Sequence, residues 1–393
     1  MKNQDLDKMI KLLKNNREKF IVILKEIFEE NKITKDNKII LDNKLLQELF
    51  LIRHVSDKNN EGFYYTFDLS KDMNYLYERI DFSQCNFSQF TYNKLLIRDQ
   101  QDLDLMADYN ITLFTDRLFK KDLHYLRLKG INVVGNFDGF NVRGTNFKGV
   151  RGGCLNPKKV FNKDLTEAIL EDVFIKDGDL DDCIINGTNF KGAKGGMIRL
   201  NPQRIKNKDL SGAILAGVYI NGSFNGCNIN NTDFSNYQGF AELNPQNIKD
   251  KKMIGTNLSG VKITESFDGC YIYSVNFKES IGAKIDFEKL DIDEDWGLHC
   301  NFADAEIYNW EDGTIFTHYV DLTSQREYER SNFDGANFIY NFFTKNKIDK
   351  YKKLPQLASA SFINEDEKLE NDIRNVFSKE ICNSQDKKLV LKK

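Results

Sequence analysis

Large apolar residues recur every five positions through the middle of the chain. The clearest run is Leu155, Val160, Leu165, Leu170, Ile175, Leu180, Ile185 and Phe190. A step of five fits neither the 3.6-residue period of an α-helix nor the 2.0-residue period of a strand. The residue two places earlier is small or slender, and the residue one place earlier is often Asp or Asn. We therefore expect a coil that turns a corner at each pentad, with the large and the small residue pointing inward.

A longer repeat contains these pentads. Segments related to LNPKKVFNKDL begin at Leu113, Leu155, Leu200 and Leu243, and their tails carry equivalent aromatics at Phe147, Phe190, Phe234 and Phe277. The aromatics are 43, 44 and 43 residues apart. Such self-similarity is the signature of a repeat architecture, in which one unit buries its apolar face only against its neighbours.

These pentads resemble the pentapeptide-repeat family, whose pattern is A(D/N)LXX and whose fold is a right-handed, four-sided β-helix. The resemblance covers roughly residues 113–343, with an outlying piece at 80–89, and it is degenerate because Ile, Val and Phe often replace Leu. It implies a mostly β solenoid whose coils stack through backbone hydrogen bonds at ~4.8 Å. The predicted inward core residues are Leu165, Leu170, Ile175, Leu180, Ile185, Phe190, Leu210, Leu215, Ile220, Phe234, Leu258 and Phe277.

The long repeat exceeds two coils of four pentads by three to five residues. We predict that these extra residues loop out at the Gly-rich and Asn-Pro stretches, residues 152–157, 195–202 and 239–245. Gly and Asn-Pro are typical of a turn that leaves a strand ladder.

Helical spacing of apolar residues marks both flanks. Asp42 is a predicted N-cap for a helix that carries Leu45, Leu46 and Leu49. Near the C-terminus, a stripe between residues 369 and 381 predicts a helix that caps the open end of the stack, joins two copies into a homodimer, or does both. The predicted segments are a helical N-terminal domain (1–60), entry coils with a helical interruption near 99–108 (61–112), the β-helix (113–345) and a C-terminal tail with its helix (346–393).

Composition excludes two classes of protein. The 393 residues are 40% hydrophobic with a net charge of −3, which fits neither a disordered chain nor a strongly basic nucleic-acid binder. Charge is nevertheless uneven, because residues 113–285 hold 24 Lys/Arg and 18 Asp/Glu, whereas residues 286–334 hold 3 and 14. The acidic stretch is either a solvated face or a docking patch for a basic partner. Its candidate partner-binding residues are Asp291, Asp293, Glu294, Asp295, Asp304, Glu306, Glu311 and Asp312.

No catalytic or metal-binding motif is present in the sequence. It contains no HExxH, GxSxG, P-loop or CxxC, and its four His are isolated. Five cysteines occupy the small inward slot of a pentad, which predicts buried structural thiols: Cys85, Cys183, Cys227, Cys270 and Cys300. We predict no enzyme activity, no cofactor and no metal site. The N-terminus has no apolar run long enough for a signal peptide or a membrane span, so we expect a cytoplasmic bacterial protein without membrane contact.

The function expected from these features is a non-enzymatic scaffold that binds another protein, with no direct nucleic-acid binding. Some members of the family it resembles imitate duplex DNA and bind DNA gyrase, so an alternative is a partial DNA mimic that acts through the acidic stretch at 286–334. A second alternative is an exported bacterial effector that acts by protein binding.

Overall fold

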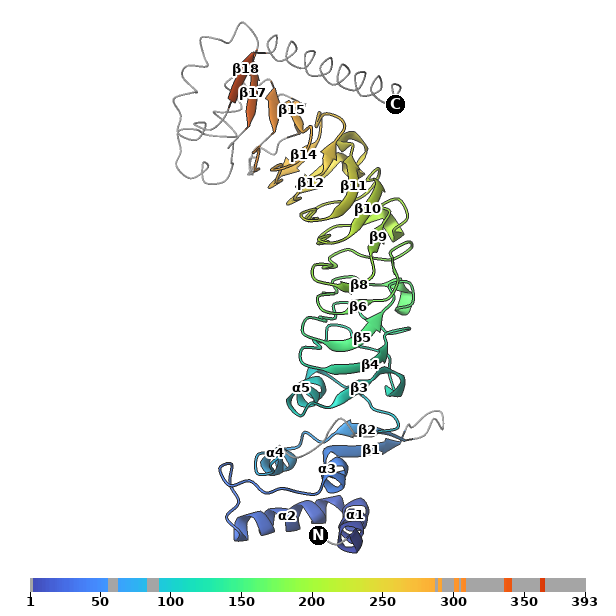
Figure 1. Ribbon diagram of the computed structural model, residues 1–393, viewed down its shortest axis with the longest axis vertical. Coiled ribbons are helices and arrows are strands. Elements are labelled where there is room, and N and C mark those ends of the chain that lie inside the picture. Colours follow the sequence, from blue (N-terminus) through green and yellow to red (C-terminus); the bar gives the residue numbers. More distant parts are fainter. Residues whose placement is uncertain are drawn as a thin grey trace, which may run out of the picture. The chain divides into compact units, whose positions relative to one another are not determined.

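Short parallel strands stack into a β-solenoid of about eight turns in the computed structural model of the chain (Figure 1). The structure describes residues 3–55, 63–82, 92–286, 289–291, 300–303, 305–308, 336–340 and 361–364. They fall into two compact units, residues 3–177 with 193–196, and residues 178–192 with 197 onward. The predicted mostly β solenoid with N-terminal helices is confirmed.

Three helices begin the first unit: α1 (Asn3–Asn15), α2 (Arg17–Glu30) and α3 (Asn43–Phe50). Side-chain oxygens cap two of them, since Asn16 accepts the N–H of Lys19 at 3.0 Å and Asp42 accepts the N–H of Lys44 at 2.9 Å. Their apolar faces supply buried residues such as Leu13 and Phe28. The predicted cap at Asp42 is therefore where the pattern placed it.

The helical segment predicted for residues 1–60 ends earlier than expected, at Phe50. Residues Leu51–Val55 form β1, which pairs antiparallel with β2 (Phe63–Phe67). The two stretches, LIRHV and FYYTF, are rich in β-branched and aromatic residues, which fit a pleated surface better than a helix. Two further helices follow, α4 (Lys71–Tyr77) and α5 (Gln100–Asp108), and α5 is the expected interruption.

Each unit holds its own parallel ladders. The sheet of the first unit has the order β3-β4-β5-β6-β8 and that of the second β13-β11-β10-β9-β7, followed by β12-β14 and β15-β16-β17-β18. In the first unit the strands are β3 (Thr112–Phe114), β4 (Asn132–Asn136), β5 (Arg151–Leu155), β6 (Phe174–Ile175) and β8 (Lys194–Gly195). In the second unit they are β7 (Gly178–Asp179), β9 (Ile198–Leu200), β10 (Tyr219–Ser223), β11 (Gln238–Leu243), β12 (Lys252–Ile254), β13 (Lys262–Ile263), β14 (Tyr271–Tyr273), β15 (Lys284–Asp286), β16 (Glu306–Tyr308), β17 (Asn337–Tyr340) and β18 (Ser361–Asn364). Short 3₁₀ turns accompany them: η2 (Thr115–Arg117), η3 (Phe161–Lys163), η4 (Lys206–Lys208), η5 (Pro245–Asn247) and η6 (Lys249–Lys251).

The inside of the solenoid is lined by the central residues of the pentads. All twelve residues expected to point inward are buried, each with at most 1% of its surface exposed. The small slot two places earlier is filled by residues such as Ala168 and Cys183, which are also buried. In some coils two phenylalanines ten residues apart pack edge to face, with ring centroids 5.0 Å apart for Phe224–Phe234 and 5.2 Å apart for Phe267–Phe277.

A ladder of Asp and Asn side chains runs along one wall of the second unit. Nδ2 of Asn257 donates to Asp233 at 2.8 Å, Nδ2 of Asn276 to Asn257 at 3.0 Å, and Nδ2 of Asn301 to Asn276 at 2.8 Å. The same Oδ1 atoms accept the N–H two residues on, as Asn257 does from Ser259 at 3.2 Å. The Asp or Asn before each large residue thus closes its own corner and ties its coil to the next.

Coils of two lengths alternate along this wall. The bridges Asn189–Ile214, Ile214–Asp233 and Asp233–Asn257 span 25, 19 and 24 residues. One short and one long coil together give the 43–44 residue repeat. The long coils contain η4 or η5 and η6, whereas no such turn lies between Ile214 and Asp233.

The prediction that the extra residues loop out is wrong. The Gly-rich stretches are ladder strands, because β5 pairs with β4 and β6, and β11 pairs with β10 and β13. The extra pentad follows them and stays in the coil. Its central residues Val160, Ile205 and Ile248 are each 4% exposed, and the backbone N–H of Lys249 donates to the carbonyl of Cys227 at 3.0 Å.

Close approach of neighbouring strands explains why glycine occurs there. A Cβ on Gly239 in β11 would lie 2.5 Å from the carbonyl oxygen of Ile220 and 3.0 Å from the ring of Tyr219, and its φ is +87°. The residue is needed inside the ladder, both for space and for a left-handed backbone conformation.

We predict that Phe190→Ala lowers the free energy of unfolding by about 3–5 kcal/mol, because it empties a fully packed interior position. Phe190 is 1% exposed, whereas Phe240 in the same unit is 56% exposed. The matched control Phe240→Ala changes stability by less than about 1 kcal/mol. Urea denaturation measures both values, and equal losses would contradict the inward placement of Phe190.

We predict that Asn257→Ala lowers the free energy of unfolding by about 1–3 kcal/mol, because its partners in the ladder lose their hydrogen bonds. Asn225→Ala is the control, since this exposed side chain makes no hydrogen bond among the described residues. Thermal unfolding should show a clear drop for the first variant only. Equal melting temperatures for the two variants would contradict a stabilising role of the ladder.

Candidate partner-binding face

The sheet β7-β9-β10-β11-β13 has five strands, more than either other sheet described in the second unit. Alternation along β9 and β10 buries Ile198, Leu200 and Ile220 and directs Arg199 and Tyr219 outward. β10 and β11 have five and six residues, more than the other strands of this sheet. This sheet therefore offers a regular surface on which side chains hold fixed spacings.

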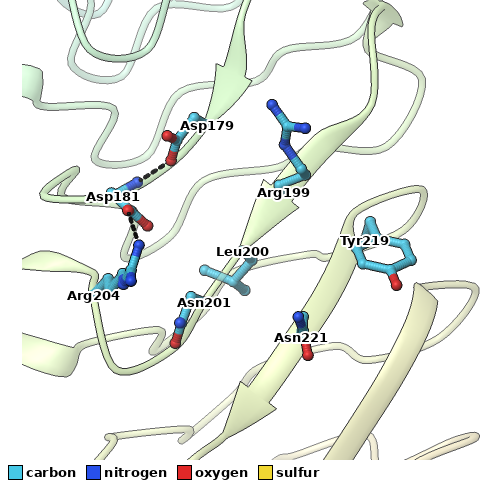
Figure 2. Close-up of a pocket in the computed structure, with 8 residues that line it drawn as sticks. All are labelled: Asp179, Asp181, Arg199, Leu200, Asn201, Arg204, Tyr219 and Asn221. Carbon is cyan, nitrogen blue, oxygen red and sulfur yellow. Dashed lines mark hydrogen bonds and ion pairs between the residues drawn. The ribbon is translucent and has the colours of Figure 1, made fainter.

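An open hollow of about 330 Å³ lies on this outer side (Figure 2). Arg199 comes from β9, and Tyr219 and Asn221 come from β10. Register places Tyr219 beside Arg199, and Arg199 beside Asp179. Its lining consists of Asp179, Asp181, Arg199, Leu200, Asn201, Arg204, Tyr219 and Asn221.

Of the two arginines that line the hollow, only Arg204 forms an ion pair among the described residues. Oδ2 of Asp181 accepts from Arg204 at 3.0 Å, and Oδ1 of Asp179 accepts the backbone N–H of Asp181 at 2.9 Å. Arg199 is exposed and has no ion-pair or hydrogen-bond partner for its side chain within the described ranges. Its guanidinium keeps five free donors, a group that suits a planar anion.

Tyr219 lines the hollow, and Phe240 lies on the next strand beside it. The ring of Tyr219 lies against Gly239, where a Cβ would displace it. One strand further, Phe240 pairs in register with Asn221 and is 56% exposed, with Nζ of Lys262 at 5.3 Å from its ring centroid. Lys262 is also engaged by Glu242 at 2.9 Å. We did not predict these residues from the sequence, although aromatics at outward pentad positions were a visible signal.

Only two residues of the predicted acidic patch lie in the described part of the chain. Asp291 is exposed and bridges to Tyr271, and Glu306 begins β16, where it pairs with Lys284. They belong to separate ladders. The other six residues, Asp293, Glu294, Asp295, Asp304, Glu311 and Asp312, lie outside the described residues.

The cysteines of the inward slot are buried thiols. Cys183, Cys227, Cys270 and Cys300 have no exposed surface. Burial raises the pKa of Cys227 and Cys270 to about 11 and that of Cys300 to about 12. Such thiols are protonated near neutral pH and are poor nucleophiles. Cys85 lies outside the described residues.

Neither a metal cluster nor a membrane-spanning helix occurs among the described residues. They contain no group of three or more His, Cys, Asp or Glu that could hold a metal ion. None of their helices is long and apolar enough to cross a membrane.

The ladders define the class of architecture. Paired residues of neighbouring strands in the ladder β7-β9-β10-β11-β13 lie 19 or 20 residues apart, the length of four pentads, and the centre of each pentad faces inward. The chain thus has the architecture of a pentapeptide-repeat protein, as its pentads predicted.

Comparison with solved structures finds similar chains, among them HetL and QnrB1. HetL, a pentapeptide-repeat protein involved in heterocyst differentiation regulation from the cyanobacterium Nostoc sp. strain PCC 7120, is 15% identical; the match covers 61% of this chain and 90% of HetL, with a TM-score of 0.19. QnrB1, a plasmid-mediated fluoroquinolone resistance protein, is 13% identical over 52% of this chain and 93% of its own, with a TM-score of 0.20. No protein-family model and no curated protein match the chain.

We predict that iodoacetamide modifies Cys154 in the folded protein and leaves Cys227 and Cys270 unmodified. Cys154 is partly exposed, whereas the other two are buried with a pKa of about 11. Raising the pH to about 9 still leaves both buried thiols protonated, because that pH is below their pKa. Peptide-resolved mass spectrometry measures each site separately, and labelling in guanidinium is the control. Equal native rates at Cys154 and Cys227 would refute the prediction.

Proposed function

We propose that this chain is a non-enzymatic repeat scaffold that binds another protein through the outer faces of its sheets. The observation that carries the proposal is the set of large apolar side chains directed outward from regular ladders. In the second unit, Met197 and Phe240 are each 56% exposed, and Ile281, which bridges to Lys262 of β13, is 60% exposed. In the first unit, Val134 of β4 and Phe174 of β6 are 52% and 50% exposed on one sheet.

Aromatic residues and Met are enriched in the cores of protein interfaces. A stacked ladder holds such side chains on a rigid frame, which lowers the entropy lost on binding. Solenoids commonly bind partners through extended faces of this kind. These properties support a protein partner for the sheet faces.

The alternative function is a partial DNA mimic that acts on gyrase through the acidic stretch at 286–334. Duplex DNA carries about one negative charge per 1.7 Å of axis. Residues 113–285 have the opposite balance, with 24 Lys/Arg against 18 Asp/Glu, whereas residues 286–334 have 14 Asp/Glu against 3 Lys/Arg. A supercoiling assay with purified gyrase separates the two proposals, since a scaffold for another partner leaves gyrase activity unchanged.

We predict that a photo-cross-linking amino acid placed at Phe240 or Phe174 gives a discrete protein adduct in extracts of the cells that naturally express the chain. The same amino acid at Phe161, which is 55% exposed on the turn η3, is the matched control. Gel shifts followed by mass spectrometry identify the adducts. The proposal fails if the sheet positions give no adduct, or only those that Phe161 gives.

A further inference from the structure

The hollow on the outer face of β9 and β10 holds one guanidinium, that of Arg199, that makes no ion pair among the described residues. Arg204 neutralises Asp181 at 3.0 Å, and Asp179 is held by the N–H of Asp181 at 2.9 Å. Lys262 and Glu242 on the same face pair with each other at 2.9 Å. The lining holds two aspartates and two arginines, so its formal charges cancel. Arg199 nevertheless makes no ion pair within the described residues, so its guanidinium is free to bind one carboxylate.

The groups beside Arg199 suit a carboxylate. Asn221 and Tyr219 project from the neighbouring strand β10 on the same side, and Figure 2 shows both around the hollow with Asn201. Their amide and hydroxyl groups can donate hydrogen bonds, and a guanidinium binds a carboxylate with two parallel N–H donors. Because Asp179 and Asp181 offset the charges of the two arginines, the hollow favours one carboxylate over the higher charge density of a nucleic-acid backbone.

Apolar contact area lies immediately next to the charge. Phe240 pairs in register with Asn221 across β10 and β11, and neighbouring strands are about 4.8 Å apart. Met197 faces outward two residues before Arg199 and is 56% exposed. A ligand that reaches Arg199 therefore also covers an aromatic or a thioether side chain.

We propose that this face binds a protein segment that places an Asp or Glu carboxylate against Arg199 and an apolar side chain against Phe240. The inference rests on the proposed scaffold function and names its partner chemistry. The carboxylate supplies specificity, and the apolar side chain supplies buried area.

Selection of a random peptide library on the full-length protein tests the proposal without a known partner. Enriched peptides should share an acidic residue within two positions of an apolar or aromatic residue. A synthetic peptide of that sequence should bind in fluorescence polarisation, and its Glu→Gln or Asp→Asn form should bind about tenfold or more weakly. Enrichment of peptides without an acidic residue, or preferential binding of a single-stranded oligonucleotide, would overturn the proposal.

Variants of the protein locate the contact. Arg199→Glu should lower the affinity for the peptide about tenfold or more. Arg199→Lys should lower this affinity less, because the positive charge remains. Lys191→Glu is the matched control, since this exposed residue of the same unit follows the Asn189–Ile214 bridge on another ladder. Unchanged circular dichroism and melting temperature show that the variants are folded. Equal losses for Arg199→Glu and Lys191→Glu, or no loss for either, would refute the proposed contact.

The peptide experiment and the cross-linking experiment fail independently. A protein adduct at Phe240 without acidic peptides in the selection removes the carboxylate inference and leaves the scaffold function. If neither a protein adduct nor acidic peptides are found, both the scaffold function and the carboxylate inference are rejected.

Discussion

The stacking of inward-facing side chains from coil to coil is the constraint on which the rest of the structure depends. A single coil cannot bury its central residues, so each Leu, Ile or Phe finds its contacts in the coils before and after it. Burial of each such side chain contributes about 1.5–3 kcal/mol. A period of five meets this requirement. In each pentad the small and the large residue face inward, and the two residues after the large one form the corner.

Hydrogen bonds across the corners make the stack continuous. Backbone ladders satisfy the strands, and the Asp and Asn side chains satisfy the turns. Where a long coil meets a short one, a glutamine completes the pairing: Nε2 of Gln203 donates to the carbonyls of Ser223 and Asn225 at 2.8 and 2.9 Å. Gln246 repeats this contact with Ser266 and Asp268 at 2.9 and 2.8 Å. The LNPQ segment therefore serves as a brace that lets coils of two lengths stack.

Burial and periodicity were readable from the sequence because they are local. Leu165, Phe190 and Ile220 are inside because each is the large residue of its own pentad, and no long-range information was needed. The glycines of β5, β8 and β11 were misread because their role depends on a neighbouring strand some 20 residues away, which a local pattern does not reveal. The β1–β2 hairpin was missed for the same reason, since antiparallel pairing gives those residues their conformation. The hollow at Arg199 was not predictable either, because register between β7, β9 and β10 assembles it.

The division between inward and outward positions also separates stability from recognition. Ile220 fixes β10 in the stack, and its neighbours Tyr219 and Asn221 are consequently held outward at spacings set by the ladder. The ring of Tyr219 rests on Gly239, so one glycine serves both the close approach of β11 and the shape of the hollow. Arg199 contributes to neither the interior nor an ion pair among the described residues. Its substitution should therefore alter what the face recognises while the solenoid beneath it keeps its fold, whereas a change at Ile220 or Gly239 alters both.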